Sequence, residues 1–415
     1  MISKRWKIFA VLAMMYVLAY FYRVSMAVVA KDLSGELGLD AALLGTLSSV
    51  FFYVYAFAQI PLGPLIDRLG GRRIIIASGL LTVAGTFLFA LSPAYPAVLA
   101  GRVLIGLGTA SVLMASLKIY GNWFSPHEFA TISGFMVAIG NLGNLSATAP
   151  LAHAVSRFGW RHPFLGVGTL QAVAVALVCL LVSDAPHAGE EPPKEPLYEP
   201  APSHGIIEGW RIVFSYPSFW LLALLAFFWY GNYMVLQGLW GGPYLMDALG
   251  LSRAEAGNVL LFTSLGFIAG CLVVGRVSDR VLKSRKWTLL GGQALLLCLM
   301  TMMLGPAEAL SRPLLACAFF AIGVAVSSGV TIYPMIREMF PSGMSATAMT
   351  ALNFFVVIGA AAIQQVMGLS VSRFPRSNGN YPPAAYHQAF LIPIAGLACA
   401  VILFFFVKDT HPGRK

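Results

Sequence analysis

The stretch GPLIDRLGGRR, residues 63–73, has a second, weaker copy in GRVSDRVLKSRK, residues 275–286. Each copy follows an apolar run and contains the pattern Gly-x-x-x-Asp-Arg. The two aspartates, Asp67 and Asp279, are 279 − 67 = 212 residues apart in a chain of 415 residues. A repeat at this spacing predicts two similar halves related by duplication.

Apolar runs surround both stretches and recur through the whole chain, and each is about 20 residues long, enough to cross a membrane as a helix. Hydrophobic residues make up 58% of the chain and charged residues only 11%, whereas soluble proteins carry roughly 25% charged residues. The sequence therefore predicts an all-α membrane protein built from two bundles of six helices. The twelve predicted transmembrane helices lie at about 8–30, 41–66, 74–92, 96–120, 128–152, 162–183, 217–245, 254–277, 287–305, 313–337, 344–371 and 386–407.

Basic residues gather in alternate loops between these spans. Because lysine and arginine concentrate in cytoplasmic loops, this pattern predicts that both termini are cytoplasmic, in a multi-pass protein of the bacterial inner membrane. The formal charge of +10 then reflects loops facing an anionic lipid bilayer, and it is no evidence for nucleic-acid binding. The basic residues left for the outer side are Lys31, Arg157, Arg161, Arg253, Arg312, Arg373 and Arg376.

The stretch 184–211 interrupts the apolar pattern with acidic residues and six prolines. Such a composition cannot bury a core and predicts a cytoplasmic linker that is extended or disordered. We therefore expect an N-terminal bundle over residues 1–183, a linker over 184–216 and a C-terminal bundle over 217–415.

The stretch at residues 63–73 resembles the loop 2–3 signature of the major facilitator superfamily, and residues 275–286 resemble its weaker copy in loop 8–9. A second run, Arg102-x-x-x-Gly106-x-Gly108, is similar to the arginine-containing motif on the fourth helix of that superfamily. The resemblance implies two pseudo-symmetric six-helix bundles. It also implies a transporter that works by alternating access.

Asp67 lies at the cytoplasmic end of its predicted helix, where several partners are possible. Its carboxylate can pair with Arg68 or Arg72, or cap the positive N-terminus of the helix that starts near residues 342–345. Such a contact would hold the halves together on one side, and the alternative is a solvated cluster of loop charges. The residues assigned to conformational coupling are Arg102, Asp67, Arg68, Arg72, Asp279 and Arg280.

Arg23 and Arg102 fall within predicted spans, with Lys118 nearer the cytoplasmic end of the span that holds Arg102, and no Asp or Glu falls in the middle of a span. Charged groups in hydrocarbon are costly and normally face a cavity with a partner. Arg23 and Arg102 both lie roughly 10 Å below the outer surface, by 1.5 Å of helix rise per residue. Since arginine binds carboxylate and phosphate with two hydrogen bonds, the pattern predicts an anionic substrate. The alternatives are structural pairing for Arg23, coupling for Arg102 and snorkelling for Lys118.

The run Tyr20-Phe-Tyr22-Arg23-Val-Ser25 is similar to helix 1 of the organic-phosphate and anion:cation symporter branches of the superfamily. In both branches an arginine at this place holds the substrate anion. Two departures stand out. Tyr22 replaces the Asp of many sugar-acid symporters, and helix 7 offers neutral polar residues where phosphate exchangers have a second arginine.

The candidate substrate-binding residues therefore combine the cations with polar residues of the C-terminal half, each of which has helix contact as its alternative role. They are Arg23, Lys118, Tyr22, Tyr230, Asn232, Tyr233, Gln237, Trp240 and Asn353.

The sequence predicts a secondary active transporter of a small organic anion, either a carboxylate or a phosphorylated metabolite. No P-loop motif occurs, so a coupling ion such as H⁺ or a counter-substrate must drive symport or exchange. There is no H-E-x-x-H motif and no cysteine constellation among the five cysteines, which argues against an enzyme, a metal site or a cofactor. We expect a monomer.

Two other functions remain open on the sequence. An exporter of hydrophobic or cationic compounds would use the many aromatic residues as an apolar cavity. A non-transporting ligand receptor of the same fold would bind a ligand without flux.

Overall fold

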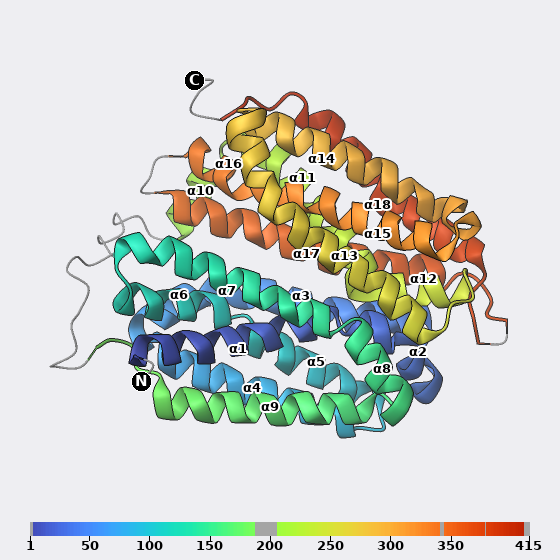
Figure 1. Ribbon diagram of the computed structural model, residues 1–415, viewed down its shortest axis with the longest axis horizontal. Helices are drawn as coiled ribbons and strands as arrows, with labels where there is room; N and C mark the ends of the chain where they lie inside the picture. Colours follow the sequence, from blue (N-terminus) through green and yellow to red (C-terminus); the bar gives the residue numbers. More distant parts are fainter. Residues whose placement is uncertain (1–2, 187–205, 341–343, 378, 411–415) are drawn as a thin grey trace. The chain divides into compact units, whose positions relative to one another are not determined.

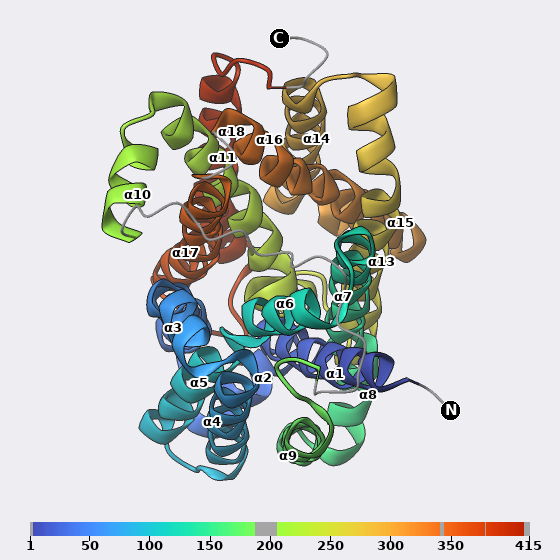
Figure 2. The same cartoon turned by 90° about the vertical axis from the view of Figure 1, so that its left-hand side faces the viewer.

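The computed structural model describes residues 3–186, 206–340, 344–377 and 379–410. Within these ranges the chain is helical, and one isolated β-bridge joins Ser377 to Asn380 (Figures 1 and 2). The α-helices are α1 (Lys4–Val24), α2 (Met26–Leu37), α3 (Ala41–Leu69), α4 (Gly71–Leu91), α5 (Tyr95–Thr109), α6 (Val112–Trp123), α7 (Pro126–Ser146), α8 (Ala149–Phe158), α9 (Arg161–Leu181), α10 (Ile206–Phe214), α11 (Pro217–Met234), α12 (Gly241–Asp247), α13 (Arg253–Arg276), α14 (Arg285–Met300), α15 (Arg312–Ser327), α16 (Ile332–Met339), α17 (Ser345–Val371) and α18 (Pro383–Phe404).

The all-helical prediction is confirmed, and each predicted span coincides with one helix or with consecutive helical segments. Among the described residues, eleven helices are long and apolar enough to cross a membrane. The helices α7 and α8, which cover the predicted span 128–152, are not among these eleven. The number of twelve spans therefore stays a prediction.

The helical runs over the first and fourth predicted spans of each half are all interrupted, and the run over the fifth span of the first half is also divided, between α7 and α8. The helix breaks at Ser25 between α1 and α2, and at residues 110–111 between α5 and α6. The π-helix η1 (Val235–Trp240) joins α11 to α12, and the 3₁₀-helix η5 (Ser328–Thr331) joins α15 to α16. Adding the repeat distance to the first break gives 25 + 212 = 237, which lies inside η1. For the break at residues 110–111 the same sum gives 322–323, which lies inside α15 and ahead of η5, so the duplication stays a prediction.

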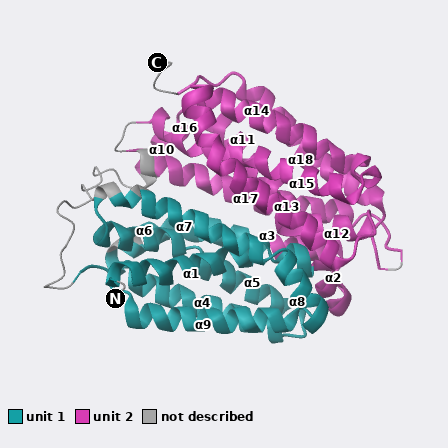
Figure 3. Ribbon diagram, in the orientation of Figure 1, with its two compact units in different colours: residues 1–29, 50–201 teal, residues 30–49, 202–415 magenta. Residues whose placement is uncertain are grey.

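The contacts between helices divide the chain into two compact units (Figure 3). The first contains residues 1–29 and 50–201, and the second contains residues 30–49 and 202–415. Residues 30–49, which include residues 30–37 of α2 and the start of α3, therefore pack with the helices of the C-terminal half. The predicted boundaries at 183 and 217 stay a prediction, because residues 187–205 of the linker lie outside the described ranges. The last part of the predicted linker is helical, since α10 (Ile206–Phe214) lies within it, and the expectation of extended or disordered chain is wrong there.

Glycines allow two helices of the second unit, α13 and α15, to pack backbone against backbone. A Cβ atom on Gly266 of α13 would overlap the carbonyl oxygen of Phe320 on α15. On the facing helix, a Cβ atom on Gly323 would overlap the carbonyl oxygen of Thr263. Small residues at helix contacts are typical of membrane bundles, because close backbone approach gains van der Waals contact.

Replacing Gly266 or Gly323 by alanine should lower the stability of the folded protein by about 1–3 kcal/mol, because two backbones must separate to admit each methyl group. The apparent melting temperature of the purified protein in detergent measures this loss. Gly291→Ala is the matched control, because Gly291 lies within α14 with nothing within 4 Å of an added Cβ. Equal melting temperatures for Gly266→Ala and Gly291→Ala would contradict the close packing of α13 against α15.

Candidate substrate-binding site

Arg23, near the end of α1, is the buried cation around which the candidate site of the first unit is built. Only 9% of its surface is exposed. The Cζ atom of its guanidinium lies 4.6 Å from the ring centre of Tyr20 and 5.0 Å from that of Tyr55. Such cation–π contacts strengthen when water is excluded. Two aromatic rings, one from α1 and one from α3, therefore help to stabilise the charge and to hold its position.

Arg102 of α5 contacts α1 at the residue before Arg23. Its Nη1 donates a hydrogen bond to the backbone oxygen of Tyr22, 3.0 Å away. Its side chain is fully buried, with the Cζ atom 4.8 Å from the ring centre of Phe51. Arg102 therefore links α5 to α1 by a hydrogen bond, three residues before the helix breaks at Ser25.

Tyr22 and Lys118 both bond to neighbouring helices of the first unit. The hydroxyl of Tyr22 is completely buried and hydrogen-bonded to the hydroxyl of Thr86 on α4, at 3.0 Å. The Nζ of Lys118 on α6 donates to the backbone oxygen of Ile66 near the end of α3, at 3.1 Å. Their roles as substrate ligands stay predictions.

In the second unit, Gln237 and Trp240 belong to the π-helix η1. The Nε2 of Gln237 donates to the hydroxyl of Ser264 at 2.8 Å, and the indole of Trp240 donates to the backbone oxygen of Gln364 at 2.9 Å. The Gln364 side chain returns a hydrogen bond to the backbone oxygen of Met234, also at 2.9 Å. Gln364 of α17 thus supports the point where α11 passes into the π-helix, a type of segment that is frequent at functional sites.

The two predicted asparagines bond to neighbouring helices. Asn232 donates from Nδ2 to the backbone oxygens of Phe228, at 2.8 Å, and of Pro393 in α18, at 3.0 Å. Asn353 on α17 accepts a hydrogen bond from the hydroxyl of Tyr333 at 3.0 Å. Both amides therefore join helices within the second unit.

Tyr230 and Tyr233 lie one helical turn apart on α11, with ring centres 6.0 Å apart. The ring of Tyr233 also stacks on that of Phe267 from α13, at 5.4 Å. The structure therefore places these two predicted residues in one aromatic cluster.

In the first unit, the contacts of the loop signature are seen at Arg72. Its backbone N–H donates to Oδ1 of Asp184 at 2.8 Å, and its Nη2 donates to the backbone oxygen of Cys179 at 2.6 Å. Arg68 is exposed. The side chain of Asp67, and the predicted contact with the helix start near residues 342–345, lie outside what the structure describes.

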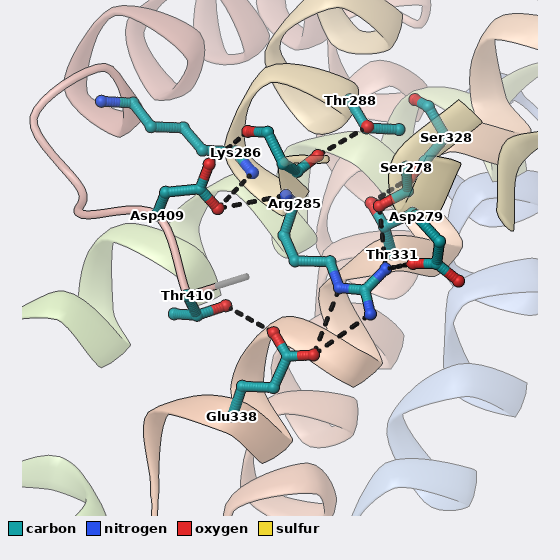
Figure 4. Close-up of polar contacts among 11 residues, drawn as sticks. Ser278, Asp279, Arg285, Lys286, Thr288, Ser328, Thr331, Glu338, Asp409 and Thr410 are labelled. Atoms are coloured by element: carbon teal, nitrogen blue, oxygen red, sulfur yellow. Dashed lines mark hydrogen bonds and ion pairs between the residues drawn. The ribbon is translucent and has the colours of Figure 1, made fainter. Parts of the chain in front are cut away.

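In the second unit, the copy of this loop forms a larger polar network (Figure 4). Arg285 pairs with Asp279, and its Nη2 lies 3.1 Å from Oε1 of Glu338 on α16. Its backbone N–H donates to Oδ1 of Asp409 at 3.1 Å. Arg280, the neighbour of Asp279, is exposed. This loop is therefore tied to both α16 and the segment after α18.

Asp184 and Asp409 play the same part in the two halves. Each follows the sixth predicted span of its half, and each accepts a backbone N–H from the first turn of the third, α4 or α14. A negative charge at a helix N-terminus is stabilised by the helix dipole. Sequence reasoning missed both aspartates, although the shared pattern Val-x-Asp at residues 182–184 and 407–409 is a signal that reveals them.

Comparison with protein families and curated proteins identifies the group to which this chain is related. A model of the Major Facilitator Superfamily matches residues 12–364. A probable L-galactonate transporter of Escherichia coli is 27% identical, covering 86% of this chain and 80% of the relative. A probable sulfoacetate transporter of Cupriavidus necator is 26% identical, covering 68% of this chain and 66% of the relative. A probable galactarate/D-glucarate transporter of Bacillus subtilis is 24% identical, covering 91% and 88%.

Solved structures share the fold. A bacterial homologue of the human lysosomal transporter Spinster, in an inward-facing conformation, aligns with a TM-score of 0.78 at 19% identity and covers 98% of this chain and 97% of that one. A D-xylose-proton symporter aligns with a TM-score of 0.77 at 15% identity and covers 99% of each chain. The family and the relatives are transporters and not enzymes. Since the family model extends over most of its length, this chain belongs to the Major Facilitator Superfamily.

Proposed function

We propose that this protein is a secondary active transporter of a small organic anion in the bacterial inner membrane. Transporters of sulfoacetate, galactonate, galactarate and glucarate are among its relatives. These compounds differ in size and in the number of hydroxyl groups, but each carries at least one acid group that is ionised at neutral pH. An anion-binding group inside the membrane is the feature that such substrates require.

The proposal rests on Arg23. A buried guanidinium within a transmembrane helix is costly unless its charge is compensated, and such residues mark substrate pathways. Its planar array of donors matches a carboxylate or sulfonate, which accepts two parallel hydrogen bonds. Tyr20 and Tyr55 fix the cation in place, so that little rotamer freedom is lost when an anion binds.

Neutral polar residues complete the proposed set of ligands. Hydroxyl and amide groups suit the uncharged, hydroxyl-bearing part of a sugar acid, because they both donate and accept hydrogen bonds. Besides Arg23 we assign substrate contacts to Lys118, Tyr22, Tyr230, Asn232, Tyr233, Gln237, Trp240 and Asn353.

The proposal also covers topology and coupling. We assign twelve spans with both termini in the cytoplasm, a monomeric state, and alternating access driven by H⁺ symport or by exchange for a counter-substrate. Arg102 and the two basic loops, with Asp67, Arg68 and Arg72 in one and Asp279 and Arg280 in the other, couple binding to the conformational change.

Replacing Arg23 by alanine should weaken substrate binding by about 1.5–3 kcal/mol, roughly 10- to 150-fold, because one charge-assisted hydrogen-bonded pair is lost. The measurement is uptake of sulfoacetate, galactonate and glucarate into proteoliposomes, with KM determined for each acid that is transported. Arg23→Lys keeps the charge without the fork and should give an intermediate KM.

Arg157→Ala removes an exposed arginine at the end of α8 and is the matched control, with an unchanged KM expected. If Arg23→Ala transports these acids as well as the unsubstituted protein does, Arg23 is not the anion ligand.

Replacing Tyr55 by leucine should raise KM by roughly 5- to 30-fold, because a cation–π contact worth about 1–2 kcal/mol at a desolvated site no longer positions Arg23. Tyr55→Phe keeps the ring and should retain most of the affinity if stacking is what matters. The same uptake assay distinguishes the two substitutions. Equal losses in Tyr55→Phe and Tyr55→Leu would show that the hydroxyl, and not the ring, is needed.

A further inference from the structure

Residues 30–49 are held to the helices of the C-terminal half by two ion pairs. In the first pair, Nζ of Lys31 lies 2.5 Å from Oδ1 of Asp247, whose side chain is only 4% exposed. Asp247 also accepts hydrogen bonds at Oδ2 from the hydroxyl of Tyr386, at 2.6 Å, and from the backbone N–H of Tyr381, at 3.2 Å. The carboxylate of Asp247, at the end of α12, is therefore held in position to pair with Lys31.

The second pair joins Asp32 to Arg253, the first residue of α13, with Nη2 and Oδ1 2.5 Å apart. Burial raises the pKa of the Asp32 carboxyl, which also lies near Glu36, even though Arg253 opposes the shift. The two side chains are 25% and 20% exposed, so water has only partial access to this pair. A pair of this kind contributes little net stability, but removal of one partner leaves a poorly solvated charge behind.

Neutral contacts continue along the same segment. Arg376 donates from Nη2 to the backbone oxygen of Leu39 at 2.8 Å, and the backbone N–H of Ala41 donates to the hydroxyl of Tyr381 at 2.9 Å. A Cβ atom on Gly368 of α17 would lie 2.6 Å from the backbone oxygen of Ala41 and 3.1 Å from Cα of Gly45. The contact thus extends from α2 into the first turns of α3.

We propose that the Lys31–Asp247 and Asp32–Arg253 ion pairs form a gate on the predicted outer side of the membrane, closed when residues 30–49 are held against α12 and α13. The inference rests on the proposed transport cycle, in which that side must open. The gate is joined to the candidate site through the chain, since α2 follows Arg23 after the break at Ser25 and α3 carries Tyr55. Opening the gate breaks both pairs and exposes the start of α3 to water.

The test measures the exposure of Ser48, which is completely buried in the closed arrangement. Ser48→Cys is introduced after replacement of the five native cysteines, and the rate of reaction with a membrane-impermeant maleimide is followed in proteoliposomes. Lys31→Ala and Arg253→Ala should each increase this rate at least about fivefold, because losing one partner shifts the equilibrium towards the open state.

The double variant with Asp32→Arg and Arg253→Asp restores opposite charges in reversed order. It should label within about twofold of the starting protein, since a restored pair recovers the coupling energy. Arg312→Ala is the matched control. It breaks the Arg312–Glu255 pair between α15 and α13, which does not involve residues 30–49, and should leave the rate unchanged.

Unchanged labelling in both single variants, or a double variant that labels as fast as Arg253→Ala, overturns the gate. The assay needs no substrate, so its outcome is independent of the proposed anion. If the gate behaves as expected but no organic acid is transported, the proposed function fails and the gate stands.

Discussion

The guanidinium of Arg23 imposes the main physical demand on the first unit, because a cation in an apolar bundle needs compensation that lipid cannot give. Part of this compensation comes from the rings of Tyr20 and Tyr55. Arg102 adds a hydrogen bond to the preceding residue of the same helix. The contacts at the end of α1 therefore involve two buried guanidinium groups, and α1 ends one residue after Arg23.

The helical run over the first predicted span of each half is interrupted, and different side chains lie at the two interruptions. In the first unit a helix breaks beside a buried arginine, and in the second the equivalent region is a π-helix supported by the amide of Gln364. Irregular backbone at membrane depth is tolerated where protein groups satisfy it. The helix α1, which carries a buried arginine, thus corresponds in the other half to α11 and η1, which carry neutral polar residues.

The pattern of apolar runs was sufficient to predict the helices, because a helix of about 20 apolar residues has few alternatives in a membrane. Arg23 and Arg102 were also predicted to lie at similar depth, since helical rise converts sequence position into height. Contacts between helices that are far apart in the chain could not be predicted from the sequence. Tyr55 has no spacing that connects it to Arg23, and Asp184 was read as part of a linker because its neighbours are prolines and acidic residues.

Asp184 and Asp409 each make a contact that lies within one half of the chain. Asp184 accepts a hydrogen bond from the first turn of α4, and Asp409 accepts one from the first turn of α14. Each of these hydrogen bonds joins two residues of the same half, and none of these residues lies after Asp184 and before α10. A chain cut after residue 186 and before α10 would therefore leave each half with its own aspartate-to-helix contact, Asp184 with α4 and Asp409 with α14.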